Sequence, residues 1–227
     1  MSGRLGLMLL VLVALAVSSS ASAAGHDPRD PQKRHNPADQ AWAKKIRVQH
    51  ADLGAGDWRV EASVNNGDDR GAPKACRNPD MSNLVETGSA ETPDFSRNGS
   101  VVGSGASVFL NERQATKAWS LAARQPLTQC LAAAFEKGLA GSGARLKIVS
   151  DAPIAMPKLA PHFKAARIHL EISGQARTIK GRLTFYLLAR GRVTAMLMIM
   201  SFDRPMQPIS QALERHLATV VAQRLQP

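Results

Sequence analysis

Three methionines at alternate positions, Met196, Met198 and Met200, are the residues best suited to soft-metal chemistry. In an extended strand this spacing places all three side chains on one face, and thioether sulfur is a ligand that Cu(I) accepts. The matching face of the preceding apolar run carries Leu183 and Phe185, however, and methionine often fills irregular hydrophobic cores. We therefore predict that the three methionines pack in the core and that the chain holds no metal or cofactor.

Histidine is the second residue type with useful chemistry, because its charge changes near neutral pH. No pair of histidines has the HExxH spacing of a zinc-binding helix. His169 lies between Arg167 and Glu171 on the polar face of a predicted strand, and it would move protons only if a pocket formed beside it. We expect it to be a surface side chain. The histidines stand at positions 26, 35, 50, 162, 169 and 216.

Two short glycine-serine segments, Gly103-Ser104-Gly105 and Gly141-Ser142-Gly143, lack the Gly-x-Ser-x-Gly spacing of a nucleophile elbow. They also lack the lysine of a phosphate-binding loop. The sequence therefore predicts a protein that is not an enzyme. The alternative is a secreted hydrolase whose serine, histidine and carboxylate meet only in the folded chain. A pocket that brings these three groups within hydrogen-bond reach would favour that alternative.

The remaining chemical signal is an excess of positive charge, with 29 Lys and Arg against 18 Asp and Glu and a net charge of +11. Such a chain attracts anionic partners, although solubility alone is a competing explanation of the excess. A strand holds charges more rigidly than a tail does, so we place the predicted ligand site on the last hairpin. The residues of this predicted site are Lys180, Arg182, Arg190 and Arg192.

The first 23 residues have the pattern of a secretory signal peptide. Arg4 precedes an apolar run from Leu5 to Val17, and the small residues Ala21-Ser22-Ala23 follow shortly after. The run is shorter than the roughly 20 residues that a membrane-spanning helix needs, so we expect cleavage near Ala23 and no permanent span. The mature chain would then be secreted or extracytoplasmic. Its predicted partners there are anionic cell-wall polymers or lipid headgroups, and nucleic acid is not expected.

Two cysteines, Cys76 and Cys130, are present in the chain. In an oxidising compartment two cysteines in one chain most simply form a disulfide with each other. We predict this bond and give it a structural role, because the sequence lacks the Cys-x-x-Cys motif of redox proteins. The chain-entropy estimate for such a loop is at most about 4 kcal/mol of stabilisation.

Four segments have the caps and apolar spacing of helices. Asn36 and Pro37 form an N-cap followed by proline at the first helical position, and Asn111 with Gln114 resembles a capping box. Pro126 separates the second and third segments. The predicted helices cover residues 37–49, 111–125, 127–139 and 208–225.

The other regular segments alternate between apolar and polar residues, which is typical of strands. The dipeptide Asn98-Gly99 tolerates the positive φ angles of a tight hairpin turn. The predicted strands cover residues 58–62, 84–97, 100–110, 146–148, 166–172, 179–188 and 192–202. A second tight turn at Arg190-Gly191 would pair Leu187 with Thr194, Phe185 with Met196, Leu183 with Met198, and Ile179 with Phe202.

These elements predict an α+β fold with a mostly antiparallel sheet of about five to seven strands flanked by helices. Residues 37–227 would form a single domain after the signal peptide at 1–23. Residues 24–36 contain two prolines and several charges but no large apolar side chain, so we expect a disordered tether there.

A set of short landmarks occurs along residues 40–225 in a fixed order. They are Gly56-Asp57-Trp58-Arg59, Cys76, Ser82-Asn83-Leu84-Val85, Thr92-Pro93-Asp94-Phe95-Ser96, Ser107-Val108-Phe109 and Cys130-Leu131. In these landmarks the chain resembles secreted actinobacterial-type proteins. More loosely, it resembles the extracytoplasmic sensor domain of PknH-type receptor kinases and the Mog1/PsbP-like α/β fold.

The resemblance implies a non-catalytic ligand-sensing or lipoprotein-like module with a helix-flanked antiparallel sheet. It carries no functional residue over to this chain, because the matched motifs are folding landmarks. Taken with the residue chemistry, it predicts an exported, monomeric binding or sensing module that acts on anionic cell-envelope ligands and is held by one disulfide.

Overall fold

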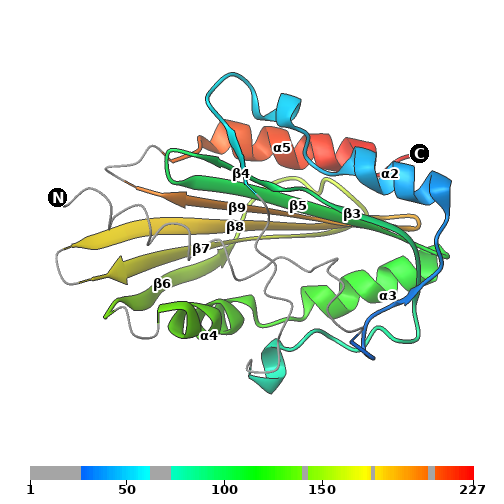
Figure 1. Ribbon diagram of the computed structural model, residues 1–227, viewed down its shortest axis with the longest axis horizontal. Helices are drawn as coiled ribbons and strands as arrows, with labels where there is room; N and C mark the ends of the chain where they lie inside the picture. The colour runs from blue at the N-terminus through cyan, green and yellow to red at the C-terminus, as the bar shows by residue number, and fades with distance from the viewer. Residues whose placement is uncertain (1–26, 62–72, 140–142, 175–176, 204–207) are drawn as a thin grey trace.

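The computed structural model shows an α+β fold in which one mixed, mostly antiparallel sheet of nine strands lies between two layers of helices (Figure 1). The strand order is β1-β3-β5-β9-β8-β7-β6, and β4 pairs with both β2 and β5. The fold class predicted from the sequence is confirmed, but the expected five to seven strands are too few. The structure describes residues 27–61, 73–139, 143–174, 177–203 and 208–227. The predicted signal peptide at 1–23 lies outside the described residues.

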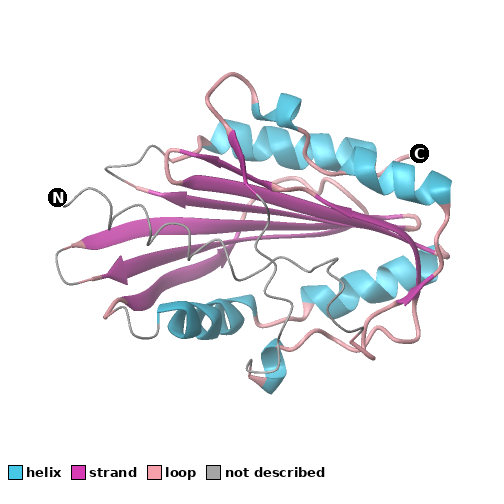
Figure 2. Ribbon diagram, in the orientation of Figure 1, coloured by secondary structure: helices cyan, strands magenta, loops and turns pink. Residues whose placement is uncertain are grey.

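The strands are drawn in magenta and the helices in cyan in Figure 2. The strands are β1 (Gln32–Lys33), β2 (Arg59–Glu61), β3 (Val85–Glu91), β4 (Asp94–Arg97), β5 (Ser100–Phe109), β6 (Arg145–Pro153), β7 (His162–Ser173), β8 (Thr178–Arg190) and β9 (Val193–Phe202). The α-helices are α2 (Pro37–Ile46), α3 (Glu112–Ala123), α4 (Leu127–Leu139) and α5 (Gln211–Arg224). Two 3-10 helices, η2 (His50–Leu53) and η3 (Lys74–Cys76), complete the described elements.

The helix starts follow from side-chain caps. The Asn36 side chain accepts hydrogen bonds from the first backbone N–H groups of α2, and Asn111 accepts one from the N–H of Gln114 at 3.0 Å. The Gln114 side chain does not complete a capping box, because its Oε1 accepts a hydrogen bond from the N–H of Val85 instead. Ser210 caps α5, so this helix begins three residues after the predicted start.

The segment 27–36 differs from the predicted disordered tether. Its strand β1 pairs in parallel with β3, and the backbone N–H of Gln32 donates to the carbonyl of Leu84 at 2.8 Å. The Lys33 ammonium also forms an ion pair with Glu86. Both β1 side chains are exposed, so the pairing depends mainly on backbone groups that every residue type except proline carries. Composition therefore could not reveal it.

Two tight turns connect the long hairpins. Asn98 and Gly99 both have positive φ, 47° and 75°, as the sequence predicts for the β4–β5 turn. The β8–β9 turn centres on Gly191 and Arg192, so Arg190 pairs with Val193. The predicted register is therefore wrong by two residues, and the observed pairs include Leu187 with Met196, Phe185 with Met198, and Leu183 with Met200. A shift of two keeps every side chain on its predicted face.

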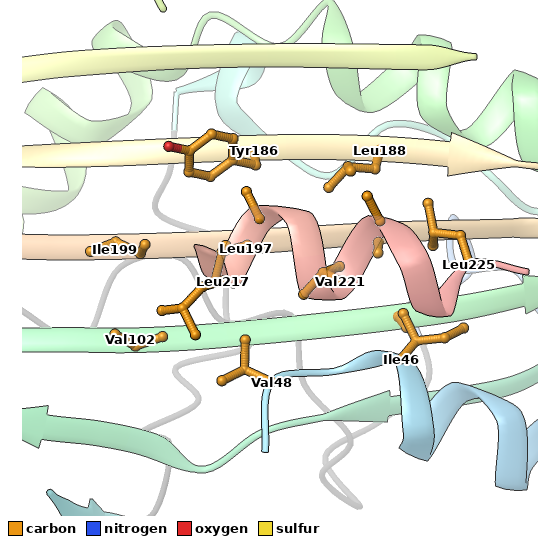
Figure 3. Packing of buried hydrophobic residues seen from close by; sticks show 14 of the residues in the cluster. Ile46, Val48, Val102, Tyr186, Leu188, Leu197, Ile199, Leu217, Val221 and Leu225 are labelled. Atoms are coloured by element: carbon orange, nitrogen blue, oxygen red, sulfur yellow. The ribbon is translucent and has the colours of Figure 1, made fainter. Parts of the chain in front are cut away.

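Each face of the sheet is covered by different helices. One hydrophobic cluster joins α2 and α5 to β5, β8 and β9, and Figure 3 shows Leu217 and Val221 of α5 beside Leu197 and Leu188. A second cluster lies between the opposite face and α4. Met198 and Met200 belong to it and are 4% and 2% exposed, which confirms core packing for those two methionines. α3 packs on a third cluster with Phe109.

The predicted disulfide between Cys76 and Cys130 is confirmed. It joins η3 to α4 across a sequence separation of 54 residues, with the two Cα atoms 5.1 Å apart. The bond therefore attaches the long connection before β3 to the α4 layer. Within the described part of the chain, no helix has both the length and the apolar character required to cross a membrane.

Candidate functional site

A pocket of about 370 Å³ lies on the α5 face of the sheet, near the edge formed by β6 and β7. Three parts of the chain form its walls: the strands β6–β8, the connection that follows β6, and the first two turns of α5. The lining residues are Ser150, Ala152, Pro153, Ile154, Ala155, Met156, Arg167, His169, Tyr186, Gln211 and Arg215.

Strand alternation places the sheet residues of this pocket on one face. In β7, Arg167 and His169 point to the side opposite the buried Ile168, which belongs to the α4 cluster. In β6 the register shifts between Ile148 and Ser150. This bulge turns Ser150 toward the pocket side, where an unbroken strand would have left it on the α4 side with Ile148.

A buried ionic cluster lies directly beside the pocket. The Glu214 side chain on α5 is 1% exposed, and its two carboxylate oxygens bind Arg167 of β7 and Arg182 of β8. The Arg182 Nε donates to Glu214 Oε1 at 3.0 Å, and another Arg182 nitrogen donates to the carbonyl of Ile209. Arg167 Nε also donates to Thr184 Oγ1 at 3.3 Å. The cluster therefore attaches α5 to the sheet and carries one net positive charge.

Tyr186 supplies an additional hydrogen-bond donor to the pocket. The residue is 1% exposed on β8, among the side chains that α5 covers (Figure 3). Its hydroxyl makes no hydrogen bond to the rest of the described chain, although the residue lines the pocket. Burial, and then the negative charge of Glu214, raise the pKa of this phenol above its ordinary value. The hydroxyl therefore stays protonated and can donate to a bound acceptor.

Arg215 extends the positive charge to the mouth of the pocket. It follows Glu214 on α5 and is exposed, and its guanidinium forms neither a hydrogen bond nor a salt bridge with any described residue. Arg167, Arg182 and Arg215 together exceed the single charge of Glu214. The pocket and its surroundings therefore attract anions.

The four cations of the predicted hairpin site do not come together. Arg182 and Arg190 are separated by eight positions of one strand, or about 26 Å at the usual rise per residue. Arg192 binds Asp39 at 2.9 Å, and this contact holds the pKa of the Asp39 carboxyl below its ordinary value. Lys180 lies 3.7 Å from Glu171. Only Arg182 reaches the surroundings of the pocket, through Glu214.

The site residues that the sequence did not single out are Arg167, Tyr186, Glu214 and Arg215. They lie on β7, β8 and α5, and no local spacing links the residues of the two strands to those of the helix. The one available signal was the alternation of apolar and polar residues along β7, which places Arg167 and His169 on the same face of the strand. His169 is exposed as predicted, and it lies at the edge of a pocket that the sequence could not locate.

The same pocket bears on the hydrolase alternative. Ser150 and His169 are direct partners across β6 and β7, and both line the pocket. Among the described residues, however, no hydrogen bond joins these two side chains, and both Glu214 oxygens are bound by arginines. A serine and a histidine are thus near each other without the contacts that activate a serine. The described residues also contain no group of three or more His, Cys, Asp or Glu side chains arranged to hold a metal ion.

Comparison with known proteins gives one distant structural similarity. No protein-family model matches the chain, and no curated protein sequence matches it. Among solved structures, the chain is similar to the extracellular domain of PknH from Mycobacterium tuberculosis, with a TM-score of 0.43 and 10% sequence identity. The alignment covers 84% of this chain and 98% of that domain.

Proposed function

We propose that this chain is an exported, non-catalytic binding or sensing module that takes a small anionic ligand in the pocket between β6–β8 and α5. The observation that carries the proposal is the set of free donors at that pocket. The buried Tyr186 hydroxyl and the exposed Arg215 guanidinium both line it and make no hydrogen bond to other described residues. An entering oxyanion would satisfy both groups.

The balance of charge also supports an anionic ligand. Glu214 is the carboxylate nearest these donors along α5, and two arginines already neutralise it. The carboxylate or phosphate of a ligand could therefore contact Arg215 and Arg167, because the negative charge of Glu214 is already neutralised. Hydrogen bonds between charged groups of this kind contribute about 1.5–3 kcal/mol each.

The predicted signal peptide and the disulfide support an exported setting. Disulfides persist in oxidising compartments and are rare in the reducing cytosol. A module that folds outside the cytoplasm would encounter the carboxylates and phosphates of the cell envelope and of the medium.

Arg215→Gln is the first test, because this side chain is exposed and the fold does not depend on its contacts. We expect the affinity of the mature protein for acetate or inorganic phosphate to fall about tenfold or more, as the loss of one charged hydrogen bond predicts. Isothermal titration calorimetry at low ionic strength measures the change. Tyr186→Phe should also weaken binding, because it removes the second free donor and leaves the ring in place.

Arg113→Gln is the matched control, since Arg113 is exposed on α3 on the opposite side of the sheet (Figure 1). This variant loses the same charge and should bind as the unchanged protein does. An equal loss of affinity in both arginine variants would mean diffuse attraction, and it would remove the pocket as the site.

The secreted hydrolase stays the second candidate, because Ser150 and His169 oppose each other within the pocket. If it is correct, short-chain nitrophenyl esters should be cleaved by the mature protein, and Ser150→Ala and His169→Ala should each abolish the cleavage. A blank screen of ester, peptide and glycoside substrates would leave the binding module as the supported function.

A further inference from the structure

One wall of the pocket is apolar over a continuous stretch of chain. Ala152, Pro153, Ile154, Ala155 and Met156 all line it, as β6 ends and the chain crosses toward β7. The N–H of Ile154 donates to the carbonyl of Ala165 at 3.1 Å, which holds this wall against β7. Ile154 and Met156 also pack against the α5-side core, so the wall is supported from behind.

The remaining lining residues are mostly polar, and Arg167 lies directly across from Ala152 in the β6–β7 pairing. Arg167 and Tyr186 come from the sheet, and Gln211 and Arg215 come from the first turns of α5. Arg215 and Gln211 lie four positions apart on one helix, and this spacing places both on the same helical face. A ligand in the pocket would therefore contact hydrogen-bond donors and positive charge from the sheet and α5, and hydrocarbon from residues 152–156.

The volume limits the size of that ligand. A water molecule takes about 30 Å³ in the liquid, so a pocket of about 370 Å³ holds on the order of twelve groups of that size. A bare carboxylate or phosphate would fill less than half of this space and would leave the apolar wall against water. A carboxylate with an eight-carbon chain has about the size that fills it.

From this mixed lining and this volume we infer that the pocket takes an amphiphilic anion, with a carboxylate or phosphate head at Arg215 and Tyr186 and a medium-length apolar body along residues 152–156. This inference rests on the proposed function, because it names the class of anion that the same site would bind. The head could belong to a fatty acid or to a phosphate monoester, since both present an oxyanion to the same donors.

Calorimetry with four probes tests the inference on the mature protein. The probes are acetate, octanoate, octyl phosphate and 1-octanol. We expect octanoate to bind at least tenfold more tightly than acetate, because each buried methylene adds favourable transfer free energy. We expect 1-octanol, which has the chain without the charge, to bind at least tenfold more weakly than octanoate. The ratio of octanoate to octyl phosphate affinity identifies the preferred head.

Two variants test the apolar and the charged parts of the lining separately. Met156→Ser should weaken octanoate binding at least threefold and leave acetate unchanged, because it removes an apolar side chain from the wall and changes no charge. Arg215→Gln should weaken octanoate and leave 1-octanol unchanged. Val60→Ser, at an exposed position on β2 that is 58% accessible, is the matched control for the loss of an apolar side chain and should change neither affinity.

The outcomes distinguish this inference from the function on which it rests. Equal affinities for acetate and octanoate would overturn the amphiphilic ligand and leave the anion-binding module standing. Equal affinities for octanoate and 1-octanol would overturn the anionic ligand itself. Absence of binding for all three anions would overturn both.

Discussion

At the scale of single residues, Glu214 is the side chain that holds α5 beside the pocket. Its carboxylate is buried and bound by Arg167 and Arg182, which come from neighbouring strands. Buried ion pairs add little net stability over an apolar packing, but removal of one partner leaves the others uncompensated. This asymmetry makes Glu214 a positioning residue for α5.

Glu214→Gln should lower the free energy of unfolding by about 3 kcal/mol, because two guanidinium groups would lose their buried counter-charge. Urea denaturation followed by circular dichroism measures the change. Glu112→Gln, in the exposed first turn of α3, is the control and should stay within about 0.5 kcal/mol of the unchanged protein. Equal stability of the two variants would contradict a structural role for the cluster.

Asp94 is a second residue with an unusual environment. It is 5% exposed in β4, and its side chain makes no hydrogen bond to other described residues. Burial, and then the negative charge of Glu61, raise the pKa of its carboxyl to about 6. The Asp94 carboxyl therefore binds its proton more tightly in the folded chain than in the unfolded chain. It follows that the contribution of Asp94 to the free energy of unfolding increases as the pH falls through about 6.

Asp94→Asn should stabilise the protein by about 1 kcal/mol at pH 7.5 and give little gain at pH 4.5, where the native carboxyl is already neutral. Thermal unfolding across this pH range measures the difference between the two proteins. Asp57→Asn, at an exposed position before β2, serves as the control. A gain that does not change with pH would contradict a charge effect at Asp94.

At the scale of elements, β1 protects one edge of the sheet. It pairs with β3 through backbone hydrogen bonds at Gln32 and Arg34, and the first part of the β3 edge would be open without it. Open edges pair readily with other chains. We therefore expect the N-terminal segment to limit self-association of the sheet.

Deletion of residues 27–35 from the mature chain should convert a monomer into a mixture of larger species as the concentration rises. Size-exclusion chromatography with light scattering measures this shift. Lys33→Ala removes the ion pair with Glu86 but keeps the backbone pairing, so it should remain monomeric. A monomeric deletion variant would show that the β3 edge needs no cover.

At the scale of the whole molecule, positive charges lie on helices such as α2 and α4 as well as on the last hairpin. The net charge of +11 should retain the protein on heparin at low salt and release it as salt shortens the screening length. The ligand site at Lys180, Arg182, Arg190 and Arg192 stays a prediction.

The doubly substituted variant Lys180→Gln with Arg190→Gln tests that hairpin prediction. It should elute from heparin at clearly lower salt than a control pair, Arg113→Gln with Lys137→Gln, if the hairpin is a dedicated site. Equal elution of the two variants would mean that net charge alone sets retention.

Local features of this chain were readable from its sequence because they depend on neighbouring residues. Asn36 and Asn111 predicted helix starts, since a short polar side chain can cap the nearest backbone N–H groups. Alternation predicted the faces of β7, β8 and β9, and Asn98-Gly99 predicted a turn. The pairing of Cys76 with Cys130 followed from their number and the expected compartment.

The tertiary structure decided what depends on distant partners. Backbone hydrogen bonds place β1 beside β3, and any residues other than proline could make those bonds. The position of the β8–β9 turn set a register that alternation cannot distinguish from one shifted by two residues. The pocket formed because packing places α5 over Arg167 and Tyr186. Periodicity along a chain therefore reports which face a side chain occupies, whereas only packing in three dimensions decides which other side chains it meets there.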